Sequence, residues 1–213
     1  MCSGLIFQMT EIEQIESRFK YATGLCQELD MTVFPLPYSP NQQQKTTKEE
    51  NKKFGFVCTP LWMVDHMISR TGTDLTLDQT TCDACSGCGQ FTIRLMRYLY
   101  EKFPDMDVNE WLENKHWFTE FQFSNIAKLI YIFGPYINVY CGDSLNLGYS
   151  GDDDHGIMIF DDENKKWFSL AAKHPQLFKM IEHNSDNLDV LIKLMGRECG
   201  EATQQGGRVL VKS

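Results

Sequence analysis

The 213-residue sequence lacks a long apolar run, a secretion signal and an excess of positive charge. No apolar segment approaches the roughly 20 residues that a membrane-spanning helix needs, so we expect no contact with a membrane. The first residues, MCSGLIFQMTEIEQ, contain no basic stretch ahead of an apolar one, which argues against a secretion signal. A net charge of −9 argues against a protein that binds nucleic acid alone, although a partner could supply a basic surface.

Cysteine is present, but the eight cysteines are scattered and do not form the framework of a small secreted protein. We therefore expect reduced thiols and a cytoplasmic protein. Cys82, Cys85 and Cys88 form a Cys-x-x-Cys-x-x-Cys array that could hold a metal ion. The ferredoxin pattern would place a fourth cysteine at position 92, which is threonine, and a zinc site would need a further pair of ligands. We expect no metal there and keep a cysteine-ligated metal protein as the second alternative.

Three zones follow one another along the chain. Residues 9–30 carry apolar side chains at helical spacing, and Thr10 followed by Glu13 forms a possible capping box. Residues 35–53 contain three prolines and then Gln, Lys and Glu, which is typical of a linker. The sequence therefore predicts an N-terminal helix and linker over residues 1–53 and one domain over residues 54–213.

Strand and helix signals alternate over the predicted domain. The pattern predicts a hairpin in which GIMIF (156–160) and KWFSL (166–170) are joined by the polar turn DDEN. We expect helices starting at Thr59-Pro60 and over 90–103, 124–133 and 188–195, and strands near 78–84, 116–121, 137–141 and 206–213. This alternation predicts an α/β fold with a parallel sheet and helices on both faces.

The segment TTCDACSGCGQF (80–91) joins a predicted strand to an amphipathic helix. In doubly wound sheets, the first strand–loop–helix corner holds ligands that contain adenosine. Gly87 and Gly89 would let the backbone approach such a ligand, and the helix N-terminus would offer N–H groups to an anion. The structural alternative is a tight turn with small buried side chains.

In this context the sequence resembles the N6-adenine DNA methyltransferases, especially the modification subunits of type I restriction systems. FVCTPLWMVDHM (56–67) is similar to the first signature of that family. DACSGCGQF (83–91) is similar, position for position, to the family's Asp-Pro-Ala-Cys-Gly-Thr-Gly-Gly-Phe loop. FTEFQFSNIAKL (118–129), NVYCGDSLNL (138–147) and GGRVLVKS (206–213) look like its second, third and fifth strands. The resemblance covers the chain from Phe54 to its end.

The resemblance implies a Rossmann-like class I methyltransferase fold whose mostly parallel sheet is truncated after the fifth strand. It implies S-adenosyl-L-methionine as the cofactor. Glu120 would accept hydrogen bonds from the ribose hydroxyls, and Asp143 would accept one from the adenine amino group. The other implied cofactor residues lie before and within the loop and beside the adenine ring: Thr59, Asp83, Ala84, Gly87, Gly89, Phe91, Ser144 and Leu145. The alternatives are a surface acid for Glu120 and an Asx-turn residue for Asp143.

The family's catalytic sequence, Asn-Pro-Pro followed by Tyr or Phe, is absent from the chain. In the family it binds the amino group of a flipped-out base and stacks on that base. The nearest candidates are His174 and Pro175, but a histidine does not reproduce an amide. We therefore expect either a methyltransferase of a DNA modification system or an inactive methyltransferase-like regulatory or partner subunit. It would reach DNA through a partner and form a dimer or hetero-oligomer through an open sheet edge.

Overall fold

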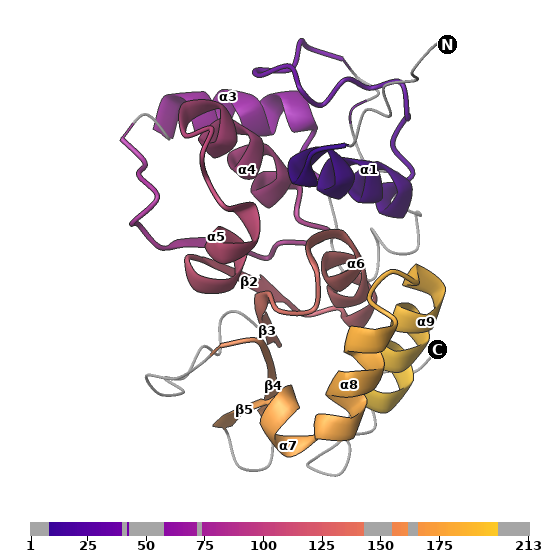
Figure 1. Ribbon diagram of the computed structural model, residues 1–213. Helices are drawn as coiled ribbons and strands as arrows, with labels where there is room; N and C mark the ends of the chain where they lie inside the picture. Colours follow the sequence, from indigo (N-terminus) through magenta and orange to yellow (C-terminus); the bar gives the residue numbers. More distant parts are fainter. Residues whose placement is uncertain are drawn as a thin grey trace, which may run out of the picture.

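The computed structural model describes residues 9–39, 42, 58–71, 74–142, 155–161 and 166–199 (Figure 1). Five strands form one sheet: β1 (Thr81–Ala84), β2 (His116–Glu120), β3 (Asn138–Cys141), β4 (Ile157–Asp161) and β5 (Lys166–Ser169). β1 to β4 are parallel, and β5 pairs antiparallel with β4 as the predicted hairpin requires. The predicted α/β fold with a mostly parallel sheet is confirmed, and it is compatible with a Rossmann-like fold. The predicted strand 206–213 lies outside the described residues.

The helices follow the predicted positions closely. Their bounds are α1 (Glu11–Thr23), α3 (Leu61–Thr71), α4 (Gln90–Lys102), α5 (Val108–Asn114), α6 (Phe123–Phe133), α7 (Leu170–Lys173), α8 (Pro175–His183) and α9 (Leu188–Lys193), followed by a π-helix (Leu194–Cys199). α3 begins directly after Pro60, whose carbonyl accepts from the N–H of Val64, so Pro60 rather than Thr59 occupies the N-cap position. α5, α7 and α8 lie where no helix was predicted.

Helices pack on one face of the sheet in the described part of the chain. His116 and Phe118 of β2 point to this face, where the His116 ring stacks on Trp111 of α5 and the Phe118 ring contacts Phe133 of α6. On the same face, Thr92 of α4 bonds His116. The sequence predicted helices on both faces. The strands instead follow one another in chain order, and right-handed crossovers made in one direction put their helices on the same side.

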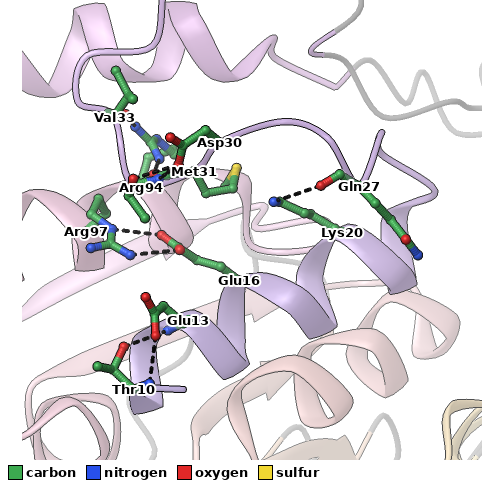
Figure 2. A network of polar contacts seen from close by, with 11 residues as sticks. Thr10, Glu13, Glu16, Lys20, Gln27, Asp30, Met31, Val33, Arg94 and Arg97 are labelled. Carbon is green, nitrogen blue, oxygen red and sulfur yellow. Dashed lines mark hydrogen bonds and ion pairs between the residues drawn. The ribbon is translucent and has the colours of Figure 1, made fainter. Parts of the chain in front are cut away.

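Helix α1 is attached to this layer by apolar packing and by one ion pair. It starts at the predicted capping box, where Thr10 N–H donates to Glu13 Oε2 at 2.7 Å, and it ends at Gly24, which has a left-handed φ of 64°. Glu16 of α1 accepts two hydrogen bonds of 2.8 Å from Arg97 of α4 (Figure 2). The apolar residues of α1 lie in the same core as α4 and α6: Ile12, Ile15 and Phe19.

A buried arginine joins α4 to α3 and to the segment that follows α1. Arg94 is fully buried, and its guanidinium bonds both carboxylate oxygens of Asp65 at 2.7 and 2.8 Å. It also donates to the carbonyls of Met31 and Val33 at 2.6 Å (Figure 2). Asp65 accepts a further bond from the N–H of Leu36. Four of the five N–H groups of this buried guanidinium therefore have a partner, and these bonds fix residues 31–36 on the helices.

Candidate cofactor-binding site

The loop that follows β1 turns sharply into α4. Cys85, Gly87 and Gly89 have left-handed φ values of 61°, 56° and 80°. Glycine adopts this conformation without the steric cost that a Cβ brings, whereas Cys85 adopts it with that cost. Three left-handed residues at alternate positions reverse the chain within the loop, so that Gln90 already begins the helix.

The carboxyl end of β2 holds this loop through four hydrogen bonds. Thr119 Oγ1 accepts from the N–H of Cys85 at 2.9 Å, and the Thr119 carbonyl accepts from both the N–H and the hydroxyl of Ser86. Glu120 Oε2 accepts from the N–H of Gly87 at 2.8 Å. The structure therefore brings Glu120 to the glycine loop, the placement that the resemblance implied.

Glu120 is an internal acceptor and not the surface acid of the structural alternative. Its exposed fraction is 6%. Oε1 accepts from the N–H of Gln122 at 2.7 Å, while Oε2 is bonded to Gly87. Burial raises the pKa of Glu120, and the hydrogen bonds from backbone amides oppose this rise.

The packing of α4 against α6 leaves no room for a side chain at Gly89. A Cβ at this position would lie 2.6 Å from Cε2 of Phe133 and 3.1 Å from Cδ2 of Leu129, both on α6. The sequence argument assigned Gly89 to the approach of a ligand. The structure supplies a different reason, since only glycine allows α4 to start this close to α6.

Asp83 is bound to the first turn of α4. Its Oδ2 accepts from the Thr92 hydroxyl at 2.9 Å, and its exposed fraction is 9%. Gly89, at the N-cap, has no side-chain oxygen, so the carboxylate of Asp83 serves the start of the helix instead. Burial raises the pKa of Asp83 to about 6, and the hydrogen bonds from Thr92 oppose this rise.

A buried hydrogen-bonded chain continues from Thr92 to the start of β1. The Thr92 hydroxyl lies 2.8 Å from His116 Nε2, and His116 Nδ1 lies 2.7 Å from the hydroxyl of Thr81. Burial lowers the pKa of His116 to about 3, so its imidazole is neutral. When Asp83 is ionised, Thr92 donates to Asp83 and accepts from His116 Nε2–H, and Nδ1 then accepts from Thr81. Sequence reasoning missed His116, which gave no signal beyond its place in a strand.

The structure describes only some of the other cofactor residues that the resemblance implies. Ala84 is exposed, and Phe91 and Thr59 are half-buried. α3 and α4 run in the same direction, because Asp65 bonds Arg94 and the carbonyl of Leu75, beyond α3, accepts from Lys102. Thr59 therefore lies at the same end of this helix pair as the loop. The implied adenine-binding residues, Asp143, Ser144 and Leu145, lie outside the described residues.

The two weak catalytic candidates are not brought to the loop. His174 lies between α7 and α8, and Pro175 is the first residue of α8. α7 directly follows β5, and β2, β3 and β4 separate β5 from β1. The His174 ring lies 5.9 Å from that of Phe168 on β5. His174 therefore lies at the opposite edge of the sheet from a ligand bound at β1.

The three cysteines of the array point in different directions. Cys82 and Cys85 are exposed, whereas Cys88 is buried with its Sγ 3.6 Å from Oδ1 of Asn125. Within the described part of the chain, no group of three His, Cys, Asp or Glu side chains could hold a metal ion. The same residues include no helix long and apolar enough to cross a membrane.

Comparison with known proteins gives no assignment. No protein-family model, no curated protein and no solved structure matches the chain. The interpretation of the site therefore depends on its geometry and on the motifs quoted above.

Proposed function

We propose that this protein binds S-adenosyl-L-methionine at the carboxyl ends of β1 and β2. The observation that carries the proposal is the 2.8 Å hydrogen bond between the Gly87 amide and Glu120 Oε2. In parallel nucleotide-binding sheets, a glycine loop follows the first strand and an acidic residue ends the second, where it bonds the ribose. In this protein, that hydrogen bond joins the glycine loop directly to Glu120.

The Glu120 carboxylate already accepts hydrogen bonds from its surroundings. The amides of Gly87 and Gln122 bond one oxygen each, and the Phe121 amide and the Asn125 side chain lie close enough to contribute. A ribose hydroxyl that approaches along the loop would share an oxygen with these groups or replace one of them. The start of α4 would favour the methionine carboxylate only while Asp83, which already bonds Thr92 of the first turn, is protonated.

The wider proposal is a protein of the N6-adenine methyltransferase type that is part of, or derived from, a DNA modification system. The position of His174, three strands away from the loop's own neighbour β2, favours its non-catalytic form. In that form the chain is a cofactor-binding regulatory or partner subunit.

Titration calorimetry with S-adenosyl-L-methionine and S-adenosylhomocysteine tests cofactor binding. Glu120→Gln should weaken binding by about tenfold or more, because hydrogen bonds to a charged acceptor are the stronger ones. Glu28→Gln removes an exposed carboxylate remote from the loop and should bind like the wild type. Thermal unfolding of each variant shows whether its fold is intact. Absence of binding to the wild type at millimolar cofactor would refute the proposal.

A further inference from the structure

Among the strands that the structure describes, β1 is the last on its side of the sheet. The N–H of Thr81 donates to the Lys115 carbonyl at 2.8 Å, so Thr81 directs its backbone groups toward β2. Backbone direction alternates along a strand, so Asp83 also faces β2 while Cys82 and Ala84 face away from it. No other described strand pairs with them, and both side chains are exposed. β1 therefore presents two residues whose backbone groups are available to a further strand.

A cavity of about 500 Å³ lies between this edge and the helices α3 and α4. We call it the β1 groove. Its lining includes polar and charged residues, namely His66, Arg70, Thr71, Asp83, Thr92 and His116, but most of the exposed surface of the wall is apolar, and its apolar side chains are Met67, Ile68, Leu75, Ala84, Phe91 and Leu95. Unpaired backbone groups beside an apolar wall are what an added strand requires, since its backbone bonds the edge and its side chains fill the wall.

We propose that the β1 groove receives an extended apolar segment of another polypeptide, which joins the sheet beside β1. Natural edge strands are commonly protected by lysine, proline or a bulge. β1 reads Thr-Cys-Asp-Ala and pairs with β2 in unbroken register, so it has no lysine, proline or bulge; its short length of four residues and the nearby α3 limit the added segment to a short one. This inference does not depend on cofactor binding. Asp83, Ala84 and Phe91, which the resemblance assigns to the cofactor, also line the groove, but Glu120, which carries the proposed function, is not among its lining residues.

A single strand fits the β1 groove better than a second copy of this chain. Met67, Ile68 and Thr71 of α3 line the groove across from β1, so α3 stands beside the free edge. A second copy that paired through its own β1 would bring its own α3 into the same space. Adjacent strands are only about 4.8 Å apart, which suits one isolated segment. Two chains of net charge −9 would in addition repel each other.

Cys82 provides a direct test, because its exposed thiol lies on the edge that we propose is paired. The neighbouring residue of an added strand would lie about 5 Å away between Cα atoms, within the range of a disulfide. The full chain is incubated in a glutathione redox buffer with the acetylated, amidated peptide KTVCVTK, and peptide mapping locates the adduct. We expect about tenfold more adduct on Cys82 than on Cys26 or Cys85, which are also exposed.

Two substitutions at Ala84 separate strand pairing from simple thiol reactivity. Ala84→Pro removes the outward N–H but no bond to β2, and it should lower the Cys82 adduct about tenfold. Ala84→Val keeps that N–H and should keep the adduct. If Ala84→Pro does not fold, the wild type is tested with the same peptide N-methylated at both valines and at the cysteine. This removes the N–H groups next to Cys82 that could face β1 in a parallel or an antiparallel peptide, and it should give the same loss. Equal labelling of the three cysteines, or a Cys82–Cys82 disulfide dimer, would overturn the proposal.

Discussion

Replacement of Asp83 by asparagine should make stability depend on pH in a range where the wild-type pair does not. In the folded protein, burial raises the pKa of Asp83 from 3.8 to about 6 and lowers that of His116 from 6.5 to about 3. Between about pH 4 and pH 6, the folded state therefore holds a proton on Asp83 and the unfolded state holds one on His116. Each state binds one proton at this pair, so the two contributions to the pH dependence cancel.

Asp83→Asn removes the group that binds a proton in the folded state. Only unfolded His116 then binds a proton, so the free energy of unfolding should fall by up to about 1.4 kcal/mol per pH unit as the pH drops, or about 3 kcal/mol from pH 6 to pH 4. His116→Gln should have the opposite effect. Only folded Asp83 then binds a proton, so this contribution to stability is fully present below about pH 4 and should fall by about 2 kcal/mol as the pH rises from 4 to 6.

Urea unfolding followed by circular dichroism, repeated between about pH 4 and pH 7, measures these slopes. Subtracting the wild-type curve removes the contributions of other acids, including Glu101 and Glu120. Asp105→Asn changes an exposed aspartate of the same charge and should stay parallel to the wild type. If Asp83→Asn also stays parallel to the wild type, the proton balance between Asp83 and His116 does not exist.

Two further predictions concern packing. Gly89→Ala should lower the free energy of unfolding by about 2–4 kcal/mol, since it adds a clash with Phe133 to the strain of a positive φ. Gly24→Ala has a similar φ but open space around it, so it should cost only about 1 kcal/mol, and equal costs in urea unfolding would contradict the clash. Arg94→Met should cost about 3–5 kcal/mol because it leaves Asp65 buried and unpaired. In a double-mutant cycle with Asp65→Leu, the two costs should couple by about 2 kcal/mol or more, whereas additive costs would show that the pair is not linked.

The sequence predicted those parts of the fold that are encoded locally. The capping box at Thr10 and Glu13, the strand–loop–helix corner at 81–90 and the β4–β5 hairpin each depend on neighbouring residues. The resemblance assigned Glu120 and the loop to one cofactor site, and the hydrogen bond between Glu120 and Gly87 is consistent with that assignment. The short helices α5, α7 and α8 were missed, since their seven, four and nine residues are too few to establish a clear helical period.

The parts that could not be predicted depend on residues far apart in the chain. Thr92 and His116 are separated by 24 positions, and neither signals the other in the sequence. Arg94 looks like a solvated arginine of an amphipathic helix until α3 and the segment after α1 close around it. Gly89 was assigned to a ligand because the Phe133 ring that excludes a side chain belongs to another helix. In each case a tertiary contact gives the residue its role.

The contacts that would bind a cofactor also hold the loop in place, and this has a consequence for how the proposed site works. Three left-handed residues and the bonds from Thr119 and Glu120 fix the loop in the structure as it stands. A ligand that meets a preformed loop does not have to supply the free energy needed to order it. Loss of the Glu120 carboxylate would remove both an acceptor for the ligand and a bond that orders the loop. Its effect on affinity must therefore be compared with its effect on unfolding, which is why Glu120→Gln and Glu28→Gln have to be measured in both assays.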